Sequence, residues 1–246
     1  MKLQQIFDRT YAVITAAGTG SRMQAKQNKQ FLPIGRFPLI IRTLRIFEAH
    51  LLISGYLVTA AQGEIAAMQD LIRQHELKKC LGVVAGGETR QASVFNGLKE
   101  LAAQIVDLAS SRVLVHDGAR CFVTNEIIDR VIAGIDKHGA CGAAMPVKDT
   151  IKRVSADGCV KETLERSQLW AMQTPQGADL SVLLAAYQRA AIEQWQVTDD
   201  LSVLELADIP VWLTAGDYRN IKLTTPEDLL IAEQLAKLED QQIGEE

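Results

Sequence analysis

The chain of 246 residues lacks the features that mark several large classes of protein. Its 26 lysines and arginines are outnumbered by 30 aspartates and glutamates, so the net charge of −4 leaves no basic excess for a nucleic-acid backbone. It has no run of about 18 apolar residues, and residues 1–5 carry no apolar segment of the signal-peptide kind. We therefore expect a soluble, cytoplasmic protein with no nucleic-acid or membrane partner.

Cysteine is also scarce, and no two cysteines have the C-x-x-C spacing of a zinc or redox motif. The four histidines are scattered, which argues against a zinc site. Four cysteines in a chain of this length are typical of free thiols in a reducing compartment. Internal repeats and low-complexity linkers are absent as well, and the length suits one large domain spanning 1–246, with room for an appendage.

Short apolar runs alternate with amphipathic stretches along the chain. The runs predict strands at 11–16, 53–60, 81–85, 112–116, 141–147 and 210–214. Helical periodicity is clear over 89–108 and over 124–138, where Thr124 is a plausible N-cap and Gly139 ends the pattern. A last helix opens near Thr225. This alternation predicts an α/β fold, a single three-layer Rossmann-like domain with a mostly parallel sheet covered on both faces.

The segment between Pro146 and Pro175 breaks this rhythm. Two strand-like runs, 150–154 and 159–164, flank an Asp157-Gly158 turn, which is a hairpin signal. We expect an inserted β-arm over 148–176 that protrudes from the domain, with Trp170 packed at its base. A lone hairpin is marginal in water, so the arm should pack on a second copy of the chain and form a homodimer. The alternative is a hairpin folded back on its own domain.

A glycine-rich loop, AAGTGSRM at 16–23, directly follows the first predicted strand. It lacks the Gly-Lys pair of the P-loop and the third glycine of the dinucleotide fingerprint, and the second strand has no acidic residue at its end. Glycines bring backbone N–H groups close to a phosphate, and Arg22 and Lys29 add positive charge. The loop therefore indicates polyphosphate binding, and the alternative is a plain turn with a stray arginine.

Three later segments also place charged groups at predicted strand ends. On the 86–94 segment, Arg90 and Ser93 share one face of a predicted helix, and this face could contact a base or a ribose. The alternative is an ordinary helix start with a solvated arginine. After the fourth strand, Asp117 is a candidate to bind Mg²⁺ or a substrate hydroxyl, and the alternative is a structural role in a turn. His116 fits a buried position at the end of the strand. Arg120 and Lys222 are candidate anion contacts, with a solvent-facing lysine as the alternative. Such loops converge on one cleft in this fold.

The order and spacing of these motifs resemble the 2-C-methyl-D-erythritol 4-phosphate cytidylyltransferase family from about Tyr11 to Leu235. The resembling pieces are AAGTGSRM at 16–23, Lys29-Gln30, GG-x-x-R-x-x-SV at 86–94, HDGAR at 116–120, DT at 149–150, the 166–176 stretch, TDD-x-S-x-x-E at 198–205 and NIK-x-TTPEDL at 220–229. The resemblance implies cytidylyl transfer from CTP, with Mg²⁺ bridging the triphosphate and an arm-exchanged homodimer.

The resemblance also implies a role for each matching residue. Arg22 and Lys29 would stabilise charge at the α-phosphate, with Arg166 and Lys222 as further catalytic cations. The residues expected to hold the cytidine nucleotide are Ala16, Ala17, Gly18, Thr19, Gly20, Gly86, Gly87, Glu88, Arg90 and Ser93. The residues expected to meet the sugar phosphate are Asp117, Arg120, Lys222 and, reaching in from the neighbouring subunit, Thr150 and Arg166. Asp117 is also the expected metal ligand.

At three positions the chain departs from the family pattern. Asn28 stands where proline usually precedes Lys-Gln, which suggests a looser loop around Lys29. Glu88 replaces the common aspartate, and Cys121 replaces the usual proline. Two rivals to the implied function stay open on the sequence: a cytidylyltransferase for another polyol phosphate such as ribitol 5-phosphate, and a non-catalytic nucleotide-binding regulator.

Overall fold

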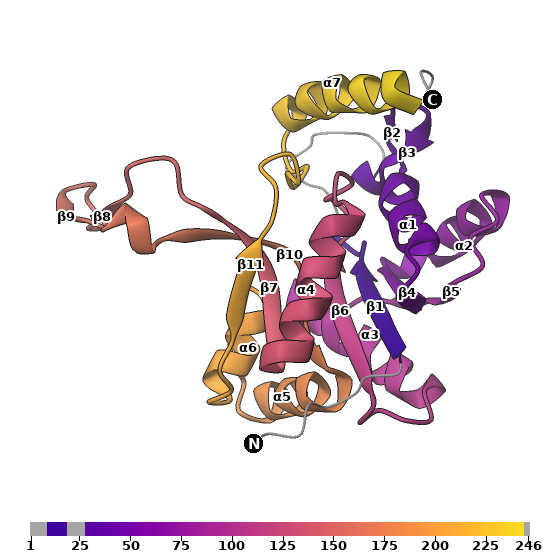
Figure 1. Cartoon of the computed structure of the whole chain (residues 1–246), viewed down its shortest axis with the longest axis horizontal. Coiled ribbons are helices and arrows are strands. Elements are labelled where there is room, and N and C mark those ends of the chain that lie inside the picture. The colour runs from indigo at the N-terminus through magenta and orange to yellow at the C-terminus, as the bar shows by residue number, and fades with distance from the viewer. Residues whose placement is uncertain (1–8, 19–27, 244–246) are drawn as a thin grey trace.

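A computed structural model describes residues 9–18 and 28–243. Its centre is a seven-stranded sheet in the order β11-β7-β10-β6-β1-β4-β5 (Figure 1). The strands are β1 (Arg9–Thr15), β4 (Ile53–Ala60), β5 (Cys80–Ala85), β6 (Ser111–Asp117), β7 (Ala140–Pro146), β10 (Trp170–Asp179) and β11 (Trp212–Ala215). Only β10 runs antiparallel to its neighbours, β6 and β7. The predicted α/β class with a mostly parallel sheet is therefore confirmed.

Helices cover both faces of the sheet, as Figure 1 shows. The helices are α1 (Leu39–Ala49), α2 (Ile65–Gln74), α3 (Arg90–Gln104), α4 (Asn125–His138), α5 (Leu180–Ile192), α6 (Asp200–Leu206) and α7 (Pro226–Ile243). Strand β1 serves both cores, because Ala12 and Ile14 pack with α1, α2 and α4, while Tyr11 and Val13 pack with α3, α5 and α6. This double burial explains why the strand reads as a continuous apolar run.

A third apolar cluster lies under α7, at one end of the sheet. There α7 packs on the short strand pair β2 (Pro33–Ile34) and β3 (Phe37–Pro38), with Leu223, Ala232 and Ala236 fully buried. The helix begins where the Asp228 carboxylate accepts hydrogen bonds from the backbone N–H groups of Thr224 and Thr225, at 2.7 and 2.8 Å. Within the described residues, no helix is both long and apolar enough to cross a membrane.

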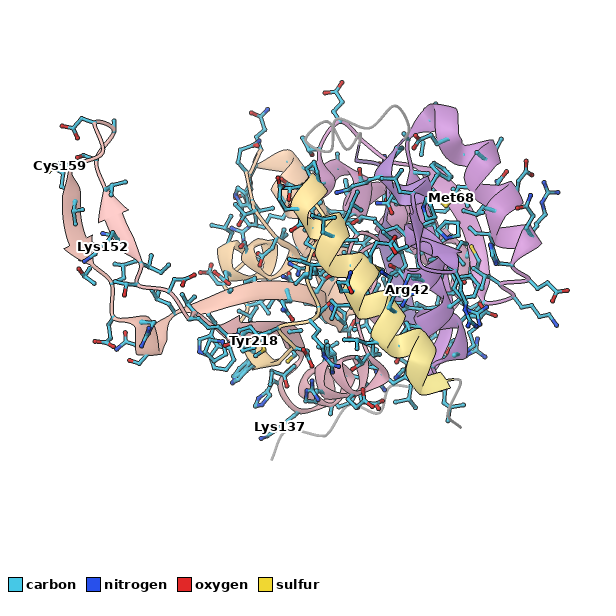
Figure 2. The ribbon with its side chains drawn as sticks, turned by 90° about the horizontal axis from the view of Figure 1, so that it is seen from above. Arg42, Met68, Lys137, Lys152, Cys159 and Tyr218 are labelled. Carbon is cyan, nitrogen blue, oxygen red and sulfur yellow. The ribbon has the colours of Figure 1, made fainter. Side chains whose placement is uncertain are left out.

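The predicted hairpin is confirmed as an arm that projects from the body (Figure 1). Strands β8 (Lys152–Val154) and β9 (Val160–Thr163) pair antiparallel, and Gly158 takes a φ of +86° in the turn between them. Every residue of the two strands is exposed. Figure 2 shows Lys152 and Cys159 at the far end of this arm, well away from Arg42 and Met68 in the body. The alternative of a hairpin folded back on its own domain is thus wrong.

The arm is shorter than the predicted 148–176. Its neck closes where the Val147 N–H donates to the Leu169 carbonyl at 3.0 Å, and residues from Trp170 onward form β10 of the main sheet. Trp170 itself is 41% exposed, so its side chain packs only in part on its own chain. The sequence does not predict β10, because the middle of the strand contains two glutamines, a threonine and a proline, which are not typical of a central strand.

The other predicted strands and helices match the structure within a few residues. The predicted end of α4 is confirmed by Gly139, whose φ of +89° is the left-handed conformation that stops a helix. Thr124 stands at the N-cap position of α4, but its side chain makes no cap hydrogen bond. The four cysteines are all free thiols, as expected.

Candidate functional site

A cavity of about 670 Å³ lies where β1, β4, β5 and β6 end. These strands are parallel, so their carboxyl ends share one edge of the sheet, the usual place for ligands in such folds. Ten of the predicted site residues line this cavity: Ala17, Gly18, Lys29, Gly86, Gly87, Glu88, Arg90, Ser93, Asp117 and Lys222. Segments distant in the sequence are therefore brought together as expected.

The remaining predicted site residues lie elsewhere. Ala16 is buried next to the cavity without lining it, and Arg120, Thr150 and Arg166 do not line it either. Thr19, Gly20 and Arg22 lie outside the described residues. The lining residues not predicted are Thr15, Gln30, Ala61, Gln62, Thr89, Ala119 and Thr224. Most of them directly adjoin a predicted residue, so the site extends slightly beyond the predicted motifs.

Asp117 is the electrostatic centre of the cavity. Its Oδ1 is 2.8 Å from Arg90 Nε, and its Oδ2 is 2.7 Å from Lys222 Nζ and 3.8 Å from Arg120 Nε. Burial alone would raise the pKa of Asp117, but the nearby cations of Arg90 and Lys222 hold that pKa well below its ordinary range. The carboxylate is thus ionised and paired with two cations from distant segments and with Arg120 of its own segment.

These contacts argue against the predicted role of Asp117 as a metal ligand. Both of its oxygens already face cationic side chains, which would repel a divalent ion. Nowhere in residues 9–18 and 28–243 do three or more His, Cys, Asp or Glu side chains gather as a metal site would require. Since Mg²⁺ is usually held by carboxylates together with substrate phosphates, these residues do not fit a metal held by the protein alone.

The Arg90 side chain is neither simply solvated nor free to contact a nucleotide base. Its Nη1 and Nη2 donate to the two oxygens of Asp200, at 3.1 and 2.7 Å, while its Nε donates to Asp117. Burial acts to lower the pKa of Arg90, but the two carboxylates raise it above its ordinary value. Asp200 is completely buried and was not predicted as a site residue.

The loop at 86–88 needs glycine at its first position. A Cβ on Gly86 would lie 2.3 Å from the Cβ of Ala17 and 2.9 Å from Ser93 Oγ, so only glycine allows the two loops this close. Ser93 accepts a hydrogen bond from the Gly87 N–H at 3.0 Å and donates to the Thr89 carbonyl at 2.9 Å. Ser93 therefore shapes the loop, while the exposed Glu88 side chain lines the cavity.

Lys29 lies on a short 3₁₀ helix, η2 (Lys29–Phe31), and is only 9% exposed. Its Nζ donates to the Leu223 carbonyl at 2.7 Å, next to Lys222. Asn28 caps this helix by accepting from the Gln30 N–H, and its Nδ2 donates to the Gly18 carbonyl and to Glu64 Oε2, at 3.1 and 2.7 Å. Hydrogen bonds thus tie Asn28 to two other segments, while residues 19–27 of the preceding loop lie outside the described residues.

Arg120 holds the segment that carries Lys222. Its Nη1 donates to the Asn220 carbonyl at 2.8 Å and its Nη2 to the Met172 carbonyl at 3.2 Å. These bonds point the guanidinium away from the cavity, so a direct anion contact by Arg120 is not supported. The neighbouring Cys121 packs in the apolar cluster under α7, where burial raises the pKa of its thiol to about 12. That departure from the family pattern serves packing.

The two predicted arm residues lie outside the cavity of their own chain. Thr150 and Arg166 are exposed and do not line the cavity. Arg166 begins the short helix η4 (Arg166–Gln168), and its Nη1 donates to the Lys148 carbonyl at 2.7 Å across the neck of the arm. Tyr218, seen in Figure 2 near the root of the arm, donates from its hydroxyl to the Pro146 carbonyl at 2.9 Å. The neck is thus anchored on the body.

Comparison with known proteins agrees with this arrangement. A sequence model of 2-C-methyl-D-erythritol 4-phosphate cytidylyltransferases matches residues 10–237. The chain belongs to this family. The enzyme of that name from Halalkalibacterium halodurans is 44% identical over 223 residues, covering 91% of this chain and 95% of the relative. The one from Bacillus licheniformis is 43% identical over 227 residues, covering 92% and 95%.

Solved structures give the same answer for the fold. The 4-diphosphocytidyl-2C-methyl-D-erythritol synthase of Anaerococcus prevotii superposes with a TM-score of 0.80 at 30% identity, covering 93% of this chain and 96% of that one. The Thermus thermophilus cytidylyltransferase has a TM-score of 0.73 at 31% identity, covering 93% and 99%. Family membership confirms the predicted enzyme class and favours the methylerythritol substrate over both rivals.

His116 is a structural residue next to the centre of the site, as expected. It is fully buried, and burial lowers its pKa from 6.5 to about 4. Its Nε2 lies 3.1 Å from the Arg120 carbonyl, which can only accept, so Nε2 carries the proton. Its Nδ1 then accepts from the Thr174 hydroxyl at 3.0 Å, and that hydroxyl oxygen accepts from the Asp117 N–H. This chain of bonds requires a neutral imidazole.

Acid should therefore destabilise the protein through His116. The unfolded chain takes up this proton near pH 6.5 and the native state only near pH 4, so the free energy of unfolding falls as pH drops through that interval. The loss is on the order of 3 kcal/mol and levels off at lower pH. Denaturant unfolding between pH 7 and 4 should show a shallower decline for His116→Gln than for the wild type. Parallel curves would contradict this.

Proposed function

We propose that this cavity transfers a cytidylyl group from CTP to 2-C-methyl-D-erythritol 4-phosphate, giving 4-diphosphocytidyl-2-C-methyl-D-erythritol and pyrophosphate. One observation carries the assignment of the cavity. Lys29 and Lys222, far apart in the sequence, reach the same cavity because Lys29 binds the carbonyl that follows Lys222. Two ammonium groups beside one glycine-rich loop suit a reaction between two phosphates. As the family membership and the four free cysteines suggest, we place the reaction in the cytoplasm.

The chemistry needs positioned charge more than it needs a base. A phosphate monoester with a second pKa of about 6 is largely dianionic at neutral pH, so its oxygen attacks the α-phosphorus without losing a proton first. The barrier comes from bringing two anions together, and cations fixed in place before the reaction lower it. In this scheme Lys29 faces the α-phosphate, with Arg22 as its partner by the sequence pattern, and Lys222 meets the sugar phosphate.

The nucleotide would lie along the two loops that meet at Gly86. The close approach of Ala17 to Gly86 brings the backbones of the two loops together. Ala16, Gly18, Thr19 and Gly20 continue the first loop in the sequence, and Gly87 and Glu88 continue the second. Backbone N–H groups at a helix start suit phosphate or a base carbonyl, and here α3 begins at Arg90.

Mg²⁺ enters this scheme as part of the nucleotide substrate. The triphosphate would supply the oxygen ligands that residues 9–18 and 28–243 do not gather, as Mg²⁺ sites on nucleotides commonly do. Asp117 then serves as the anchor for Lys222 and as a contact for a substrate hydroxyl. The divalent ion would offset charge on the triphosphate, and the residues of this chain would hold and align the two reacting phosphates.

The arm would complete the site of a second subunit. Thr150 and Arg166 lie on the arm, which projects away from the domain, and neither residue lines the cavity of its own chain. A dianionic phosphate is best held by more than one cation, and the planar fork of arginine suits it. We therefore propose a homodimer in which Arg166 and Thr150 of one protomer contact the sugar phosphate bound by the other.

The proposed reaction is tested directly by pyrophosphate release from CTP. Release should require 2-C-methyl-D-erythritol 4-phosphate, should stop in a chelator and should return with Mg²⁺, because the triphosphate needs a divalent counter-charge. Ribitol 5-phosphate should give a far lower kcat/KM. Equal rates with both polyol phosphates would refute the substrate assignment, and full activity in the chelator would remove Mg²⁺ from the reaction.

Lys29→Ala should lower kcat about 10²-fold, the scale for losing one preorganised charge donor, and should weaken CTP binding less. Lys79→Ala is a matched control, because Lys79 Nζ also donates to a backbone carbonyl, that of His50 at 2.7 Å, outside the cavity. Its kcat should stay within about twofold of the wild type. Steady-state kinetics of both variants give the kcat values that test this prediction. Near-normal turnover by Lys29→Ala would rule out a transition-state role for Lys29.

Mixing two inactive dimers tests the action of the arm in trans. One dimer carries Arg166→Ala and the other Lys29→Ala. If the arm serves the partner, a mixed dimer has one site with both defects and one with neither, so up to about half of the wild-type activity returns. Mass spectrometry confirms subunit exchange, and each variant incubated alone is the control. Exchange without any recovery would show that Arg166 serves its own subunit.

A further inference from the structure

Behind the cavity lies a carboxylate that the proposed reaction does not use. Asp200 is fully buried and does not line the cavity. Its Oδ1 accepts from Arg90 Nη1 at 3.1 Å and from the Tyr187 hydroxyl at 2.6 Å, and its Oδ2 accepts from Arg90 Nη2 at 2.7 Å. A carboxylate that takes both arms of a guanidinium fixes the plane and the direction of that group.

The position of Asp200 is itself set by the central sheet. Asp200 opens α6, and its backbone N–H donates to Gln176 Oε1 at 2.9 Å. The Leu201 N–H donates to the same oxygen at 3.0 Å. Gln176 is 1% exposed and lies on β10, where it pairs with Val115 of β6. Because β6 ends at Asp117, the two carboxylates are held on one rigid frame.

Arg90 joins these two carboxylates. While its Nη1 and Nη2 are held by Asp200, only its Nε reaches Asp117, at Oδ1 and 2.8 Å. The other oxygen, Oδ2, receives Lys222 Nζ at 2.7 Å. Asp200 thus determines which oxygen of Asp117 remains for Lys222.

We infer that Asp200 is a positioning residue for the sugar-phosphate half of the site, acting through Arg90 on Asp117 and Lys222. The inference rests on the proposed function, in which Asp117 and Lys222 meet the polyol phosphate. Without the charge at Asp200, Asp117 is the only other carboxylate among the described residues that contacts the guanidinium of Arg90. A fork turned onto Asp117 occupies both oxygens and displaces Lys222 from Oδ2. The loop at 86–88 keeps its shape, because Ser93 holds it independently.

Asp200→Asn tests this, because it preserves the shape of the side chain and removes its charge. The KM for 2-C-methyl-D-erythritol 4-phosphate should rise tenfold or more, since a charge-assisted contact is lost, while the KM for CTP should change less than about twofold. Initial rates of pyrophosphate release with each substrate varied in turn give both constants. An unchanged KM for the polyol phosphate in a folded variant would overturn the inference.

Tyr187→Phe is the matched control, because it removes the other hydrogen bond to the same carboxylate and leaves the fork of Arg90 in place. Its Tm should fall, and both KM values should stay within about twofold of the wild type. If Tyr187→Phe raised the KM for the polyol phosphate as much as Asp200→Asn does, general loosening of the site would be the cause and the inference would fall. Equal increases for both substrates in Asp200→Asn would overturn it in the same way.

A second variant keeps the test decisive if Asp200→Asn fails to fold. Arg90→Lys retains the positive charge, but one ammonium cannot reproduce a fork that bridges two carboxylates. It should show the same selective rise in the KM for the polyol phosphate, and unchanged KM values would overturn the inference. A wild-type protein that released no pyrophosphate would refute the proposed function instead, so the two failures are distinguishable.

Discussion

The ion cluster around Asp117 is the interaction on which the rest of the site depends. A carboxylate at the buried end of β6 is costly unless cations pair with it, and removing one partner of such a buried pair costs on the order of 3–5 kcal/mol. Of its partners, Arg120 follows it by three residues, while Arg90 and Lys222 come from two distant segments. Pairing the charge therefore draws those segments onto the end of the sheet, and the act of folding also assembles the site.

The antiparallel strand β10 is the structural counterpart of that cluster. Its polar residues are buried and hold loops in place. Gln173 Nε2 donates to the Asp217 carbonyl at 2.7 Å, and the Thr174 carbonyl accepts from Asn220 Nδ2 at 2.9 Å. These bonds fix the segment that leads to Lys222. In turn, Gln176 fixes the start of α6 and with it Asp200. A strand with an apolar sequence could not satisfy so many loop carbonyl and N–H groups.

The features that depend on residues close together in the chain could be predicted from the sequence. The buried strands, the Asp157-Gly158 turn and the glycine loop each carry a short-range signal, and all but the part of that loop outside the described residues are found as expected. Strand β10 and the partners of Arg90 could not be read in this way. The polar residues of β10 make sense only once the loops they bind are folded, and Asp200 lies 110 residues from Arg90. These two residues come into contact only when the whole sheet has assembled.

Three cations around one carboxylate also resolve a conflict within the proposed reaction. Lys222 must be held in place before the substrate arrives, yet it must be available to a dianionic phosphate. Asp117 provides the holding contact, and the phosphate, with its greater charge, competes for the ammonium. Because Arg90 and Arg120 remain beside Asp117 when Lys222 turns to the substrate, the buried carboxylate is never left unpaired. When the sugar phosphate binds, Lys222 then exchanges one anionic partner for another, and no buried charge is left without a partner.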